Sequence, residues 1–224
     1  MITELAAHEP RLQGIVAQAP LEKGAAVRDD LAALAANRLV KGVRRITQGE
    51  ADPDFCNRPD FVEGVRALAE FSLTCDLCCT HSQLEPIIRL VRACPDVPFV
   101  LDHLGKPDIR SGKREPWAMQ LQELASLPNA WCKLSGLVTE ADPTHWTYND
   151  IEFYLQHALA CFGADRLMYG GDWPVVTLAA SYSRWIECTE RALDSLSARD
   201  LQKIYRDNAR HFYKLEKSDS PIPA

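Results

Sequence analysis

The sequence predicts an α/β fold built around a parallel β-sheet, and two patterns indicate this. Short apolar runs rich in β-branched residues alternate with helical stretches along nearly the whole chain, as they do in successive βα units. Polar side chains gather directly after these runs, at the carboxyl ends of the predicted strands. Since this end of the sheet carries the active site in βα barrels, the sequence also indicates an enzyme.

Six strands and seven main helices are predicted in order along the chain. The strands cover residues 12–19, 39–46, 73–79, 98–102, 130–134 and 166–169. Helical periodicity predicts helices at residues 25–37, 60–70, 84–93, 116–127, 150–162, 182–196 and 198–213, and residues 2–8 are also helix-like. We expect Ser197 to cap the last helix, and Asn149 or Tyr148 to cap the helix that begins at residue 150.

Length and composition predict one soluble domain. The 224 residues are 46% hydrophobic and 25% charged, which is ordinary for a globular protein with one core. We expect this domain to span residues 1–215 and residues 216–224, rich in Ser and Pro, to form a frayed tail. The net charge of −6 and the scattered basic residues argue against nucleic acid as a partner.

No signal for export or membrane insertion is found in the sequence. No apolar run is long enough to span a membrane, and the first residues, MITELAAHEPRLQ, do not resemble a signal peptide. We therefore predict a cytoplasmic protein whose eight cysteines are reduced thiols. Cys75, Cys78 and Cys79 form a CxxCC pattern without a second Cys or His pair, so we predict buried small side chains rather than a zinc ribbon.

Other α/β enzyme classes lack their motifs here. No Gly-rich phosphate loop follows a strand, which argues against a dinucleotide-binding sheet. No G-x-S-x-G nucleophile elbow is present, which argues against a Ser-His-Asp hydrolase of that type. A closed barrel needs eight strands and only six are predicted, so either the sheet is open or further strands precede this sequence.

Three motifs resemble those of the amidohydrolase-related lactonases, the group that contains fuconolactonase, rhamnonolactonase and pyrone-dicarboxylate lactonase. They are VLDHLGKPDIR (residues 100–110), WCKLSGLVTEAD (131–142) and RLMYGGDWPV (166–175), with further matches at KGVRR (41–45), DLCCTHSQL (76–84) and NARHFYKL (208–215). The resemblance covers residues 11–215 and implies a (β/α)₈ TIM-type barrel that lacks the first two βα units. Family members begin with a strand ending in His-x-His, a motif that does not occur in this sequence.

The resemblance implies a hydrolase of carbohydrate metabolism that opens a sugar-acid lactone. Asp172 would be the general base that activates water, and His103 would polarise the lactone carbonyl. In the wider superfamily of metal-dependent hydrolases and decarboxylases, His103 and Asp172 would instead hold one divalent ion such as zinc. The two mechanisms remain open, and no metal ligand is certain.

Five further residues are candidates for substrate binding. Val43 and Arg45 share one strand face, and if that face is interior, Arg45 rather than Arg44 faces the pocket. The other candidates lie in the resembling segments or directly after strands: His81, whose His-Ser-Gln-Leu context differs from the family pattern, Lys133, Ser135 and Trp173.

An incomplete barrel without catalytic activity is the alternative from another class. The absent His-x-His motivates it. Two exposed sheet edges would favour association, so we expect poor stability or oligomers of the chain.

Overall fold

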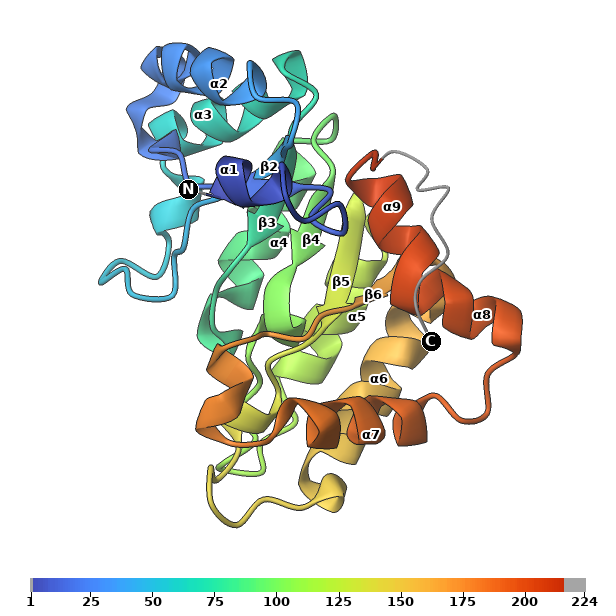
Figure 1. The fold of residues 1–224 in the computed structure, drawn as a ribbon. Helices are drawn as coiled ribbons and strands as arrows, with labels where there is room; N and C mark the ends of the chain where they lie inside the picture. Colours follow the sequence, from blue (N-terminus) through green and yellow to red (C-terminus); the bar gives the residue numbers. More distant parts are fainter. Residues whose placement is uncertain (1, 216–224) are drawn as a thin grey trace.

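The computed structural model describes residues 2–215, which form one sheet of six parallel strands in sequence order (Figure 1). The strands are β1 (Ile15–Ala17), β2 (Val40–Arg44), β3 (Thr74–Leu77), β4 (Phe99–Leu101), β5 (Ala130–Leu134) and β6 (Leu167–Tyr169). Every predicted strand is present, and most are shorter than predicted because only the central residues pair with a neighbour. The α/β fold class with a parallel sheet is therefore confirmed.

One short helix precedes the first strand, and the others connect consecutive strands or follow the last one. They are α1 (Ile2–Ala6), α2 (Arg28–Ala35), α3 (Pro59–Glu70), α4 (Leu84–Ala93), α5 (Trp117–Ala125), α6 (Tyr148–Arg166), α7 (Tyr182–Ala192), α8 (Ala198–Gln202) and α9 (Asn208–Phe212). The predicted helix at residues 198–213 is observed as α8 and α9 joined by a π-helical turn over Lys203–Asp207. The predicted tail at residues 216–224 lies outside the described residues.

Of the two predicted helix caps, one is confirmed and the other is wrong. Ser197 caps α8, since its hydroxyl accepts a hydrogen bond from the Asp200 amide. Before α6, however, the extended residue is Thr147, whose amide and hydroxyl both donate to the Asp150 carboxylate. Tyr148 and Asn149 are already helical because this reciprocal pairing starts the helix at Tyr148, two residues before the predicted start.

The two faces of the sheet differ in chemistry. Outward side chains such as Val43, Cys75 and Leu134 are at most 3% exposed and belong to the main hydrophobic core, which helices such as α4, α5 and α6 cover (Figure 1). The pairing register places Arg44 beside Asp76, and Lys133 beside Met168, on the opposite face. That inner face therefore carries most of the charge of the sheet.

The end of the described chain returns to the inner face. Phe212 packs with Val100 and Met168, and Tyr213 joins the same small cluster. This contact seals part of the inner face and brings the residue after α9 within reach of the strands.

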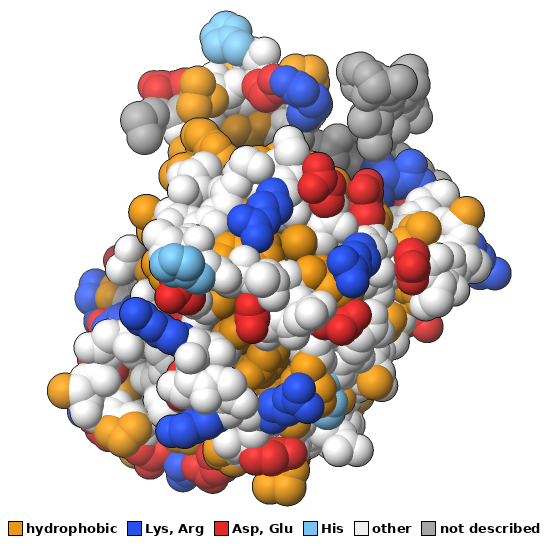
Figure 2. Space-filling view, turned by 90° about the horizontal axis from the view of Figure 1, so that it is seen from below, with side chains coloured by type: hydrophobic (Ala, Val, Ile, Leu, Met, Phe, Trp, Pro, Cys, Tyr) orange, Lys and Arg blue, Asp and Glu red, His pale blue; other side chains and the backbone are white. Residues whose placement is uncertain are grey.

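Three other expectations concern cysteines, membranes and surface charge. All eight cysteines carry free thiols, and Cys75 and Cys79 lie in the core as predicted. Among residues 2–215, no helix is both long and apolar enough to cross a membrane. Figure 2 shows positive and negative side chains interspersed over one face rather than gathered by sign.

Candidate active site

Charged side chains from five strands meet at the carboxyl end of the sheet. Because the strands are parallel and neighbours in sequence order, their last residues and the turns after them lie along one edge. The residues concerned are Arg44, Asp76, Asp102, His103, Lys133, Ser135 and Asp172. In the sequence these residues lie within or directly after predicted strands, and the fold brings them together.

His103 and Asp172 form the centre of this edge. His103 Nε2 lies 3.6 Å from Asp172 Oδ1, and each side chain is 12% exposed. The other ring nitrogen of His103 is 2.8 Å from the Ser135 hydroxyl, which orients the imidazole. Burial lowers the pKa of His103, against the opposing effect of the Asp102 and Asp172 carboxylates, so the neutral ring is favoured.

The turn that carries His103 has an unusual backbone. His103, Leu104 and Lys106 all have positive φ angles, of 53°, 52° and 51°. Such a conformation is uncommon for residues other than glycine and costs on the order of 1–3 kcal/mol each. Trp117 Nε1 donates to the Leu104 carbonyl at 2.7 Å, and the Lys106 amide donates to the His103 carbonyl at 2.8 Å. These contacts stabilise a turn that aims the imidazole at Asp172.

Two glycines make room for this arrangement. A Cβ atom on Gly136, which has a φ of +64°, would lie 2.6 Å from His103 Nδ1. A Cβ atom on Gly170 would lie 2.9 Å from the Ser135 Cβ. Both distances are shorter than real Cβ contacts, so a larger residue would displace the imidazole or its hydrogen-bond partner.

A buried ionic network lies beneath the His103 turn. Lys133 Nζ is 2.5 Å from Asp76 Oδ2 and 2.7 Å from Asp102 Oδ1, and both carboxylates are 1% exposed. Arg44 Nη1 lies 3.2 Å from Asp102 Oδ2, and the Tyr213 hydroxyl donates to Asp76 Oδ2 at 2.8 Å. The network thus balances two buried carboxylates with two cations.

The pKa values in the network follow from burial and pairing. Burial raises the pKa of Asp76, against the effect of Lys133. Burial also acts to raise the pKa of Asp102, but Lys133, His103 and Arg44 hold it below its ordinary value. Burial acts to lower the pKa of Lys133, but the neighbouring Asp76 and Asp102 carboxylates outweigh it and raise this pKa well above the usual range. The ammonium group therefore stays charged.

The face predicted for Arg45 is wrong. Val43 is fully buried in the outer core, so the inward alternation runs through Arg44, whose guanidinium reaches Asp102. Arg45 instead pairs with Glu50 at 2.6 Å and with Glu22 at 3.2 Å. A period of two places alternate residues on one face but does not say which face is interior.

The other predicted substrate residues occupy different positions. Lys133 is taken up by the two buried carboxylates, and its side chain is only 18% exposed. A ring nitrogen of His81 lies 3.0 Å from the Lys106 carbonyl, so His81 supports the His103 turn. Ser135 is the partner of His103, whereas Trp173 is 72% exposed at the surface beside Asp172.

Sequence reasoning missed Glu140 and Cys78. Glu140 lies 3.9 Å from Lys106 Nζ, and burial together with Asp172 raises its pKa while Lys106 and His81 oppose this. Glu140 lies within the motif at residues 131–142, which was the available signal. Cys78 was treated only as a core thiol, yet its sulfur lies near the ligand atoms of Asp102 and His103.

The donor set at this edge is compatible with a zinc ion. One ligand atom each from Cys78, Asp102 and His103 lies within 4.8 Å of the others, and such sulfur, oxygen and nitrogen donors suit zinc. Both oxygens of Asp102 already contact cations, Arg44 and Lys133, so Asp172 is better placed than Asp102 to supply the carboxylate ligand of a metal ion. Two ligands of one tetrahedral zinc lie roughly 3.4 Å apart. The 3.6 Å between His103 and Asp172 is close to that value.

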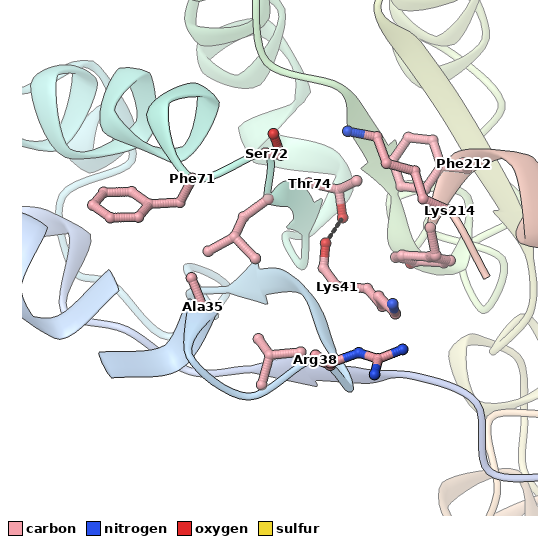
Figure 3. Close-up of a pocket in the computed structure, with 11 residues that line it drawn as sticks. Ala35, Arg38, Lys41, Phe71, Ser72, Thr74, Phe212 and Lys214 are labelled. Carbon is pink, nitrogen blue, oxygen red and sulfur yellow. Dashed lines mark hydrogen bonds between the residues drawn. The ribbon is translucent and has the colours of Figure 1, made fainter. Parts of the chain in front are cut away.

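A separate hollow of about 180 Å³ lies at the amino ends of β2 and β3, the opposite end of the strands (Figure 3). Arg38, Lys41 and Lys214 contribute cations, and Thr74 donates to the Lys41 carbonyl at 3.4 Å. None of the predicted site residues lines it. The candidate catalytic residues therefore lie at the carboxyl end of the strands, away from this hollow.

Known proteins resemble this chain along nearly its whole length. The family model described as amidohydrolase matches residues 1–215. An L-fucono-1,5-lactonase of Burkholderia ambifaria is 35% identical over 192 residues, which are 84% of this chain and 66% of that protein. One from Burkholderia multivorans is 36% identical, with 96% of this chain and 75% of that protein covered. The chain thus spans about two thirds to three quarters of the length of these relatives.

Solved structures agree with the fold. An amidohydrolase from Burkholderia multivorans with bound zinc has a TM-score of 0.89 and 34% identity, over 95% of this chain and 77% of that one. A putative 2-pyrone-4,6-dicarboxylic acid hydrolase from Pseudomonas putida has a TM-score of 0.72 and 26% identity, over 96% of this chain and 79% of that one. With its motifs, its sheet and these matches, the chain belongs to the amidohydrolase family.

Proposed function

We propose that this chain carries the active-site residues of a hydrolase that opens a sugar-acid lactone. The observation that carries the proposal is the apposition of His103 and Asp172, 3.6 Å apart and both largely buried, at the carboxyl end of the sheet. The similarity to two L-fucono-1,5-lactonases supports the same reaction. A buried imidazole and carboxylate facing each other are suited to water activation and carbonyl polarisation.

In this mechanism Asp172 accepts a proton from water as the water oxygen attacks the lactone carbonyl carbon. His103, oriented by Ser135, donates a hydrogen bond from Nε2 to the carbonyl oxygen, on which negative charge develops. The ring C–O bond then breaks, and the proton held by Asp172 passes to the leaving alkoxide. The product is an open hydroxy acid, and Asp172 returns to its charged form.

The charge balance of the site favours a neutral polyhydroxylated lactone over a dicarboxylate. Arg44 is paired with Asp102, Lys133 with Asp76 and Asp102, and Lys106 with Glu140. A substrate carboxylate would have to compete with these protein carboxylates for the same cations. Hydroxyl groups can share hydrogen bonds with paired groups without displacing them, so a sugar lactone is the better match.

We further propose that the six strands correspond to the third through eighth strands of an eight-stranded TIM-type barrel. Their sequence order in the sheet, and relatives that are longer than this chain, support that assignment. On this proposal residues 1–215 form a single domain. The eight free thiols support a reducing, cytoplasmic location.

A metal-assisted reaction is the second candidate, and the zinc-bound relative together with the donor set motivates it. His103 and Asp172 would hold the ion, with Cys78 as a third ligand. When bound, zinc supplies a Lewis acid that polarises the lactone carbonyl.

A lactone panel with and without chelator tests both candidates. We expect the purified chain to release acid from L-fucono-1,5-lactone, followed with a pH indicator, at least tenfold faster than from 2-pyrone-4,6-dicarboxylate. Activity that persists after complete chelation, with metal content checked by mass spectrometry, supports the metal-free mechanism. Activity lost on chelation and restored by zinc supports the metal-assisted one. If no lactone is opened in either condition, the proposed function is wrong for this chain.

A further inference from the structure

At the carboxyl end of the sheet, Lys133 is a largely buried cation that contacts two buried carboxylates. It lies on the inner face of β5, and its ammonium group contacts Asp76 at 2.5 Å and Asp102 at 2.7 Å. Its Nζ atom lies over the Tyr213 ring, 5.6 Å from the ring centroid. The hollow that Lys133 borders is lined by β1, the segment before it, Lys41, Tyr213 and Leu215, and neither His103 nor Asp172 lines it. Lys133 is thus not placed as a direct contact for the reacting lactone.

Asp102 connects Lys133 to the candidate catalytic histidine. It directly precedes His103 and begins the turn in which His103 and Leu104 have positive φ angles. Its Oδ1 atom lies against Lys133 and its Oδ2 atom against Arg44. The Arg44 side chain is 42% exposed, so Lys133 is the buried anchor of the pair. Because Asp102 is the first residue of this turn, holding its carboxylate in place also holds the start of the turn that carries His103.

Asp76 ties the same ammonium group to the end of the described chain. Its Oδ2 atom accepts from both Lys133 and Tyr213, whereas its buried Oδ1 atom accepts no hydrogen bond from the described residues. Loss of Lys133 would therefore leave two buried carboxylates with reduced compensation. Breaking a buried pair by removing one partner is costly for this reason.

We propose that Lys133 is a positioning residue, which holds Asp102 and thereby the turn that presents His103 to Asp172. The proposal rests on the proposed lactonase function for its kinetic consequence, but the anchoring itself concerns the geometry of His103. It replaces the sequence-based expectation that Lys133 binds substrate. A substrate-binding lysine and a positioning lysine have different effects on KM and kcat.

The kinetic experiment compares Lys133→Met, Lys133→Arg and the control Lys113→Met, whose side chain is 72% exposed. We expect Lys133→Met to lower kcat at least tenfold with KM within twofold of the original. Lys133→Arg, which keeps the charge, should recover most of kcat, and Lys113→Met should change neither constant. A rise in KM with unchanged kcat would show substrate binding and overturn the proposal.

A second readout does not depend on activity. The imidazole nitrogen signals of His103, assigned with a His103→Gln variant, report the hydrogen bond to Ser135 by NMR. We expect Lys133→Met to move these signals toward those of a solvated histidine, and Lys113→Met to leave them in place. If Lys133→Met does not fold, the double variant Asp76→Asn with Lys133→Met removes one charge of each sign and should show the same shift.

The two readouts separate the two proposals. An original chain that opens no lactone, together with His103 signals that shift in Lys133→Met, contradicts the proposed function and supports the anchoring. His103 signals that stay unchanged in every folded Lys133 variant contradict the anchoring, whatever the activity.

Discussion

The outer and inner faces of the sheet are made from alternate residues of the same strands, yet they differ in almost every physical respect. On β5, Leu134 is 1% exposed in the hydrocarbon core, whereas its neighbours Lys133 and Ser135 engage Asp102 and His103. Four of the six described non-glycine residues with positive φ, His103, Leu104, Lys106 and Asp172, also lie at the carboxyl end where the inner-face network meets the turns. One face thus supplies stability, and the other holds strain and charge in place for chemistry.

The largest effect on the inner side is expected from Asp172→Asn. If Asp172 is the general base, as proposed, the substitution should lower kcat by about 10²–10⁴-fold, because the amide cannot accept the proton of the attacking water. The midpoint of thermal unfolding should change little, since Asp172 contributes no core packing. The exposed Asp194→Asn is the matched control and should keep full activity in the same assay. Full activity in Asp172→Asn would contradict the assigned role.

On the outer side the expected effect is on stability. Leu167, fully buried on β6, loses its packing in Leu167→Ala, which should reduce the free energy of unfolding by about 2–5 kcal/mol. Urea unfolding followed by circular dichroism measures this loss. At a temperature where the variant remains folded, kcat should stay within a few fold of the original. A Leu167→Ala variant as stable as the original but inactive would contradict the assignment of stability to the outer face and activity to the inner face.

A smaller and more local effect is expected from Gly136→Ala. Both Gly136 and Gly112 have positive φ angles, of +64° and +65°, but a Cβ atom on Gly112 meets nothing within 4 Å. Alanine should therefore cost about 1 kcal/mol of backbone strain at either position. Only Gly136→Ala should also displace His103 and lower kcat, by roughly tenfold if about 1.4 kcal/mol of transition-state stabilisation is lost. Equal kcat values in the two variants would show that the His103 ring tolerates the contact.

The positions of the strands and of His103 and Asp172 could be predicted from the sequence because both are local signals. Apolar runs mark the strands, α4 and β5 have the predicted bounds, and short motifs mark the two site residues. Glu140 also lies in such a motif. Nothing in the local sequence shows that Glu140 pairs with Lys106, or that Asp172 lies close enough to raise the pKa of Glu140.

The sequence by itself determined the order of βα units, the family and the histidine and aspartate at the centre of the site. Only the tertiary structure decided that Arg44 rather than Arg45 faces inward, and that Lys133 contacts the carboxylates of Asp76 and Asp102. The physical reason is that alternation gives the period of a strand but not its phase, which depends on what the helices cover. The partners of a buried charge likewise come from other strands, so they are set by the register of the whole sheet.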